Sequence, residues 1–141
     1  MLKAQGDVLA FLKRNDEALG RYEAALGLYR AVGDRLGEAN VLQSQGKLAL
    51  SGGQVEEGLR LLEEARRLYQ AVGDQVGLAN LSITLARLAA AQGDFAAAAD
   101  LIQPAIDFGR RIGHPLAESL AGEQAEWRRR AAGMGGSASG G

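Results

Sequence analysis

Few residues of this chain could take part in acid–base or nucleophilic chemistry. His114 is the only histidine, and the sequence contains no cysteine. Ser119 is the serine nearest to His114, but a nucleophile activated by a base also needs a group that orients the base, and no such third residue is indicated. Carboxylates such as Glu57, Glu63 and Glu123 alternate with arginines on helix faces expected to be exposed, where no pocket would shift their pKa values toward catalysis. We therefore expect no enzymatic activity and no cofactor.

Binding sites with a recognisable motif are also missing from the sequence. Without cysteine, neither a disulfide nor a thiolate metal site can form, and we expect no metal ion. The glycines end helical segments rather than follow strands, so neither a Walker-type loop nor a dinucleotide-binding loop is indicated. A net charge of -1 gives no electrostatic reason to expect nucleic acid or an anionic membrane as the partner.

The N-terminal segment and the hydropathy of the chain predict its compartment. The apolar run in residues 1–14 is short and is broken by Asp7, unlike the core of a signal peptide. No stretch of the sequence has the length of apolar residues needed to cross a bilayer. We expect a cytoplasmic protein without a membrane partner.

A repeat of about forty residues organises the elements that carry these side chains. Residues 30–69 superpose on residues 70–109, with the string Ala-Val-Gly-Asp at the same place in both and Asn40 falling on Asn80. Residues 1–29 form an earlier, partial copy that lacks the start of its first helix. A fixed period of this length is typical of stacked helical repeats.

Each copy of the repeat divides into two helical runs joined by a glycine-containing turn. Between residues 55 and 69 the apolar side chains recur at three- and four-residue steps, the spacing of one helix face. We expect Gly53 and Gly93 to end helices in the left-handed conformation, and Asp94 to cap the next helix. Pro104 should kink its helix rather than end it. The predicted helices cover residues 2–12, 15–32, 35–52, 54–72, 75–92, 95–112 and 115–131.

The remaining segments are predicted to be turns and a tail. His114 falls on the register of Asp34 and Asp74, which precede helices, and Pro115 follows it at a favoured first helical position. We therefore interpret His114 as a turn residue. Residues 133–141, which are rich in glycine and serine, are expected to form a flexible tail or an added linker.

The pattern resembles the tetratricopeptide repeat (TPR) family over nearly the whole chain, from Leu2 to about Arg130. Small residues stand in register at the three sites where the helices of that family touch. The long period, and the similar strings at 33–39 and 73–79, resemble the long-period subtype of LGN-type adaptors, kinesin light chains and bacterial signalling ATPases and regulators. The small residues are Gly6, Gly46 and Ala86; Ala18, Gly58 and Ala98; and Ala25, Ala65 and Ala105.

This resemblance implies an all-α fold, a right-handed α-solenoid of three TPR-like helix hairpins with a C-terminal capping helix. One repeat domain would cover residues 1–132. Its repeats would span about 1–32, 33–72 and 73–112, and its capping helix 115–131.

The resemblance also implies a non-catalytic protein–protein interaction module, part of a larger adaptor or signalling regulator, that binds a peptide or partner protein on its concave face. An amide in the first turn of a helix and a cation two turns later could hold an extended peptide or an acidic group. For Asn40 and Asn80 a purely structural role between helices is an equal alternative, whereas for Lys47 and Arg87 binding is favoured. The predicted partner-binding residues are Asn40, Gln43, Ser44, Lys47, Asn80, Ile83, Thr84 and Arg87.

The alternative function is a structural element that assembles with its own copies. No polar capping helix precedes the partial first hairpin, so Leu2, Leu9 and Leu12 would form an apolar face open to association. We expect a homodimer through this N-terminal end at high concentration.

The run from Trp127 to Arg130 has two interpretations. A basic and aromatic patch can bind nucleic acid or an acidic partner. The favoured interpretation is the polar outer surface of the capping helix, with Trp127 packed on the preceding hairpin, because a solenoid needs a polar end to stay soluble.

Overall fold

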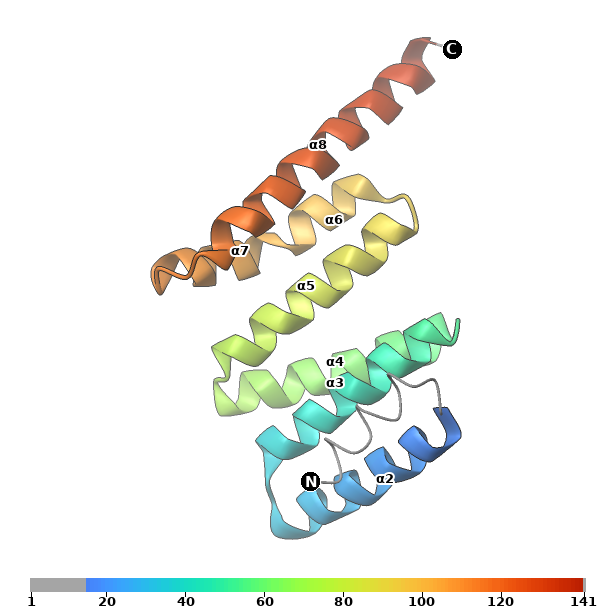
Figure 1. The fold of residues 1–141 in the computed structure, drawn as a ribbon, viewed down its shortest axis with the longest axis vertical. Coiled ribbons are helices and arrows are strands. Elements are labelled where there is room, and N and C mark those ends of the chain that lie inside the picture. The colour runs from blue at the N-terminus through green and yellow to red at the C-terminus, as the bar shows by residue number, and fades with distance from the viewer. Residues whose placement is uncertain (1–14, 141) are drawn as a thin grey trace. The chain divides into compact units, whose positions relative to one another are not determined.

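The computed structural model of this chain describes the backbone of residues 15–140 and the side chains of residues 16–133, and it is all-α. No β-strand occurs among these residues (Figure 1). The helices are α2 (Asn15–Val32), α3 (Arg35–Ser51), α4 (Val55–Val72), α5 (Gln75–Ala91), α6 (Phe95–Leu101), α7 (Gln103–Arg111) and α8 (Leu116–Gly140).

The all-α prediction is confirmed, and α2 to α5 match the predicted ranges to within one residue at each end. The expected helix at 2–12 lies outside the described residues. The chain divides into two compact units, Met1–Gly77 and Leu78–Gly141, with the boundary inside α5. The right-handed solenoid stays a prediction.

In the first unit, α3 and α4 form a hairpin whose backbones touch at two glycines. A Cβ added at Gly46 would lie 2.8 Å from the Leu62 side chain and 3.1 Å from the Gly58 carbonyl oxygen. A Cβ at Gly58 would lie 3.0 Å from the carbonyl oxygen of Gly46. Both positions are buried, as the repeat register predicts for its small residues. Any side chain here would push the two helices apart.

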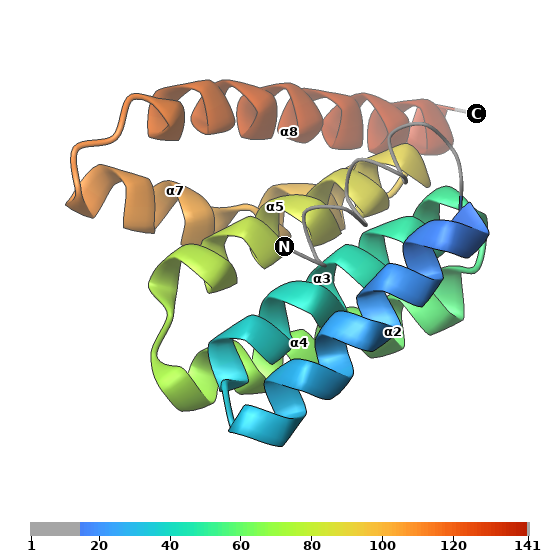
Figure 2. The ribbon, with the colours of Figure 1, turned by 60° about the horizontal axis from the view of Figure 1, so that its bottom comes forward.

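The helix α2 lies alongside α3 in the same unit (Figure 2). Ala18 and Ala25, two of the predicted small positions, are buried on either side of Tyr22. They pack with Val41 and Leu48 of α3 in one apolar cluster. The alternation of small and large residues along α2 lets the two helices interdigitate.

The second unit has its own core, built mainly from alanine and isoleucine. Ala98 in the middle of α6, Ile102 at its C-terminal end and Ile106 of α7 are fully buried. They pack with Leu120 and Trp127 of α8. The core has few aromatic residues, so it depends on the close approach of helices that alanine permits.

The predicted turn chemistry is confirmed. Gly53 and Gly93 have φ angles of 81° and 83°, in the left-handed region. The Ala97 backbone N–H donates to Asp94 Oδ1 at 3.1 Å, which caps α6. His114 also acts at a turn, because the Leu116 N–H donates to its Nδ1 at 3.0 Å where α8 begins.

Two helix ends differ from prediction. The expected single helix at 95–112 is divided at Ile102 into α6 and α7. Pro104 has no N–H to bond to the carbonyl of Asp100, and its ring crowds that carbonyl. Ala105 N–H donates instead to the Ile102 oxygen at 3.1 Å, while Ile102 itself keeps helical angles. The second difference is the C-terminal end of α8, which continues to Gly140 rather than ending at residue 131. The flexibility of the tail stays a prediction.

Candidate functional site

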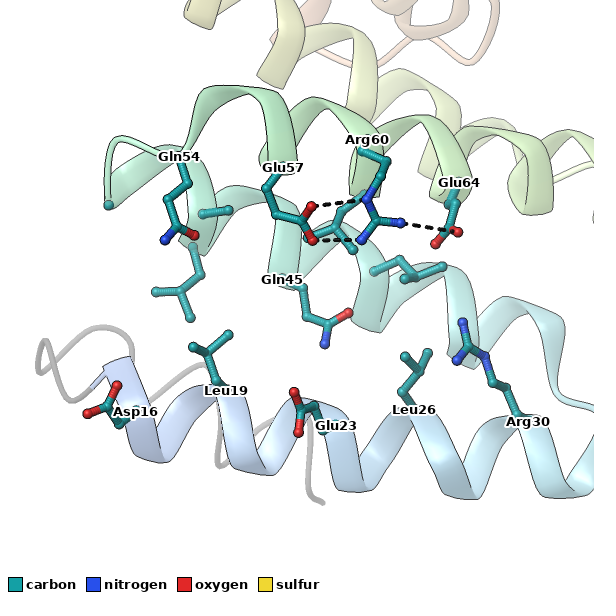
Figure 3. Close-up of a pocket in the computed structure, with 15 residues that line it drawn as sticks. Asp16, Leu19, Glu23, Leu26, Arg30, Gln45, Gln54, Glu57, Arg60 and Glu64 are labelled. Atoms are coloured by element: carbon teal, nitrogen blue, oxygen red, sulfur yellow. Dashed lines mark hydrogen bonds and ion pairs between the residues drawn. The ribbon is translucent and has the colours of Figure 1, made fainter.

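A groove of about 730 Å³ runs between α2, α3 and α4 in the first unit (Figure 3). Side chains of α2 form one wall, those of α4 form the other, and α3 lies between them. The lining residues are Asp16, Leu19, Glu23, Leu26, Arg30, Leu42, Gln45, Leu48, Ala49, Gly52, Gln54, Glu57, Arg60, Leu61 and Glu64.

The base of the groove is apolar. Leu42 is 1% exposed and Leu48 is buried, both on α3. Leu26 of α2 and Leu61 of α4 are half-buried at its sides, and Leu19 is exposed at one end. An apolar strip between two helices offers burial to an aliphatic side chain of another molecule.

The α4 wall carries two carboxylates, Glu57 and Glu64, and one cation, Arg60, which lies near both of them. Arg60 Nη2 lies 2.6 Å from Glu57 Oε1, and Arg60 Nη1 lies 3.6 Å from Glu64 Oε1. The hydrogen bond from Arg60 lowers the pKa of Glu57 below its ordinary value. This wall is therefore an ion-pair network with its cation already engaged by two carboxylates.

The α2 wall is different because two of its carboxylates are unpaired. Asp16 and Glu23 have no ion-pair or hydrogen-bond partner among the described residues. Arg30, on the same wall, donates from Nε to Glu38 Oε2 at 2.9 Å. The only unengaged charges that the described residues place on the groove lining are therefore negative.

Gln45 lies in the groove between α3 and α2 (Figure 3). The residue is 8% exposed, and its buried Oε1 has no hydrogen-bond partner among the described residues. A buried polar atom without a partner is costly, and an incoming ligand that bonds to it removes that cost. Gln45 is thus a polar group in an otherwise apolar groove base.

None of the four predicted binding residues on α3 lines this groove. Asn40 and Gln43 instead meet the phenol of Tyr69, a fully buried residue of α4. Tyr69 Oη lies 2.6 Å from Asn40 Oδ1 and 2.9 Å from Gln43 Oε1. For Asn40 this contact favours the structural alternative. Gln43 is itself buried.

The phenol of Tyr69 stays protonated at neutral pH. Burial first, and the charge of Asp74 second, raise the pKa of Tyr69 to about 12. A hydroxyl has one hydrogen, so it can donate to only one of the two amides at a time and can accept a hydrogen bond from the other. Gln43 Nε2 is buried without another partner. Rotation of that amide would let it donate to the Tyr69 oxygen.

The other two α3 candidates are more accessible. Ser44 is half-buried, and Lys47 is exposed. Lys47 has no ion-pair or hydrogen-bond partner within residues 16–133. The binding interpretation of Lys47 therefore stays a prediction, on a surface of α3 separate from the groove.

In the second unit, the candidates at the equivalent positions make different contacts. Asn80 is exposed, and its carbonyl accepts a hydrogen bond from Thr84 Oγ1 at 3.0 Å. Ile83 packs against the core of the unit. Arg87 is not an unengaged cation, because its Nη2 lies 2.7 Å from Glu123 Oε1 of α8. This ion pair connects α5 and α8 within the unit.

The terminal basic run makes contacts that agree with its interpretation as a cap. Trp127 is 8% exposed and belongs to the core of the second unit. Arg129 and Arg130 both bond to Glu126, and the Arg130 guanidinium lies 5.4 Å from the centre of the Phe95 ring. These contacts reduce the net charge that the run presents to an anion.

Leu2, Leu9 and Leu12 lie outside the described residues, so the homodimer stays a prediction. Within the described residues, no group of three or more His, Asp or Glu side chains could hold a metal ion. Nor is any helix there long and apolar enough to cross a membrane.

Sequence reasoning missed Gln45, the carboxylates of α2 and the polar role of Tyr69. Gln45 does carry a signal, since it lies three residues from both Leu42 and Leu48, on the helix face that these two buried leucines share. Tyr69 ends the apolar face predicted for residues 55–69, but only the fold shows which groups meet its hydroxyl. In comparisons with known proteins, no family model and no curated protein matches this chain.

Proposed function

We propose that this chain is a non-catalytic module that binds a polypeptide partner. The observation that carries the proposal is the groove between α2, α3 and α4, with its apolar base, charged walls and a buried amide. An apolar cleft with a few polar groups that fix orientation is the usual form of a recognition site. A helix or an extended peptide laid in such a groove would bury aliphatic side chains along its base.

The repeat register supports the same proposal from the sequence. Helical repeats of this period, as in the TPR family that the chain resembles, use their grooves and faces as extended binding surfaces. The groove and the α3 surface around Lys47 are the two places in the first unit where such a partner would bind. Of the two, the groove is the one lined by leucines of all three helices.

A selection from a random linear peptide library tests this function. Selected peptides would be labelled, and their dissociation constants measured by fluorescence anisotropy against the parent chain and two variants. Ala49→Phe would place an aromatic ring in the groove, and Lys47→Glu would reverse the exposed charge on the other α3 surface. Thermal melting would show that each variant remains folded.

We expect the selected peptides to bind the parent chain and to lose affinity in Ala49→Phe by about tenfold or more, because the ring occupies the space of a peptide side chain. Loss in Lys47→Glu alone would move the site to the α3 surface predicted from the sequence. No enrichment of any peptide over an unrelated helical protein would contradict the proposed function.

A further inference from the structure

We infer that the occupant of the α2–α3–α4 groove is a basic amphipathic peptide segment, with aliphatic side chains flanked by lysine or arginine. This inference rests on the proposed function and names the chemical class of its partner. Three features of the groove carry it: the apolar base, the unpaired carboxylates and the buried amide.

The apolar base sets the aliphatic part of the ligand. Leu42 and Leu48 close the base from below, and the half-buried Leu26 and Leu61 leave apolar surface at its sides on which aliphatic side chains of a peptide would pack. A small polar metabolite would leave this surface exposed to water. Burial of aliphatic surface is the main source of affinity in helix-in-groove recognition.

The unpaired carboxylates set the sign of the ligand's charge. Asp16 and Glu23 stand on α2, across the groove from Glu57 and Arg60 (Figure 3). Because Arg60 is already bonded to Glu57 and lies close to Glu64, the α4 wall does not attract an anion. Charge complementarity therefore favours a cationic ligand and disfavours an acidic peptide or a phosphate backbone.

The buried amide of Gln45 sets the contact with the ligand backbone. A primary amide offers both an acceptor and donors, which is the hydrogen-bonding complement of a peptide group. Its Oε1 has no partner in the ligand-free chain, and it lies between the two walls. This atom is itself buried, so a peptide group, or a lysine or arginine side chain, would reach it once the amide turns toward the groove.

Three short synthetic peptides, acetylated and amidated, test the inference. The first combines leucine and lysine in an amphipathic pattern, the second replaces each lysine by glutamate, and the third replaces each leucine by serine. Binding would be measured by fluorescence anisotropy at low and at physiological salt. The leucine–lysine peptide should bind at least about tenfold more tightly than either of the others, and salt should weaken it.

Two sets of variants locate the binding. Asp16→Asn combined with Glu23→Gln should weaken the leucine–lysine peptide by about threefold to tenfold. The matched control, Asp100→Asn combined with Asp107→Asn, removes the same charge from α6 and α7 and should leave the affinity unchanged. Equal loss in the two double variants would show only a general charge effect and would overturn the inference.

Gln45→Leu separates a ligand contact from a structural role. Because it removes a buried atom without a partner, it should leave the melting temperature of the free chain unchanged or higher. It should nevertheless weaken the leucine–lysine peptide by about fivefold. An unchanged affinity would remove Gln45 from the site and overturn its assigned contact.

The failure of this inference can be told from the failure of the proposed function. Tighter binding by the leucine–glutamate peptide would overturn the basic occupant and leave a peptide-binding module. If none of the three peptides binds while library-selected peptides do, the basic occupant alone is wrong. If neither kind of peptide binds, the proposed function is wrong as well.

Discussion

The aromatic ring of Tyr69 lies against the backbone of Gly77, with no space between them for a side chain. A Cβ added at Gly77 would lie 2.4 Å from Cδ1 of Tyr69. One period earlier, Tyr29 and Gly37 make the same contact at the same 2.4 Å. The same pair therefore recurs in two repeats: a tyrosine near the end of one helix packs on a glycine eight positions later, at the start of the next helix. This contact joins the two helices across the turn between repeats.

The next copy of this pair has side chains of different sizes at the two positions. Gly109 takes the place of the tyrosine and Ala117 the place of the glycine. A Cβ added at Gly109 would lie 2.9 Å from the Cβ of Ala117, so this contact is also closed. The two positions compensate for each other in size. Close packing requires the combined volume of their two side chains to fill the space between the helices.

Gly77→Ala should destabilise the chain by about 1–3 kcal/mol, since the new methyl group overlaps the Tyr69 ring. Gly122→Ala is the control, because no atom lies within 4 Å of a Cβ at that helical glycine. This control should stabilise by about 0.5–1 kcal/mol through helix propensity. Urea denaturation of both variants would measure the difference. Equal midpoints would contradict the Tyr69–Gly77 contact.

Tyr69 should also make the stability depend on pH in the alkaline range. Its folded-state pKa of about 12 lies above the ordinary value of about 10. The folded state therefore holds the proton more tightly, and this stabilisation is present below pH of about 10 and is lost as the pH rises toward about 12. The loss can reach about 3 kcal/mol.

Denaturation midpoints at pH of about 9 and about 11 would measure this loss in the parent chain and in Tyr69→Phe. Phenylalanine has no titrating group, so the variant should be less stable at the lower pH but should lose less on going to the higher pH. The same loss in both proteins would show that Tyr69 titrates as it does in the unfolded chain.

Gln54→Asp should stabilise α4. The backbone at Gln54 has φ -89° and ψ 70°, close to φ -89° and ψ 75° at Asp94 one period later. Asp94 caps its helix, whereas Gln54 forms no side-chain capping bond. The shorter carboxylate should raise the free energy of unfolding by about 0.5–1.5 kcal/mol. The reverse change, Asp94→Gln, should lower it by a similar amount, and no change in either variant would contradict the capping argument.

Ala65→Leu should destabilise the first unit by about 1–3 kcal/mol, because the position is fully buried on α4. Glu56→Leu, at an exposed position of the same helix, is the control and should change the stability little. Denaturation midpoints would compare the two variants. A similar midpoint for both would mean that the repeat register places Ala65 wrongly.

The helices could be predicted from the sequence because the repeat presents the same signals more than once. Gly53 and Gly93 mark equivalent helix ends, and the burial of Ala65 and Ala105 follows from the same register. The break at Ile102 was harder, because whether Pro104 bends or divides a helix depends on how the freed carbonyl group is accommodated.

The candidate site could be predicted much less well. The register can place Asn40 and Lys47 on one helix, but it cannot show that Tyr69 engages the first and leaves the second exposed. The groove depends on the spacing of α2 from α4, which is set by side-chain packing and not by periodicity. Arg87 differs from Lys47 because Glu123, far along the chain, reaches it.

Mapping the binding site of a selected peptide by NMR tests the central claim most directly. Backbone amide shifts of the isotopically labelled chain would be followed as the peptide is added. The groove account predicts that the largest changes fall in α2, α3 and α4 at residues lining the groove, including Gln45, and that α8 is little affected. Changes confined to the surface around Ser44 and Lys47, or to residues 78–141, would contradict it.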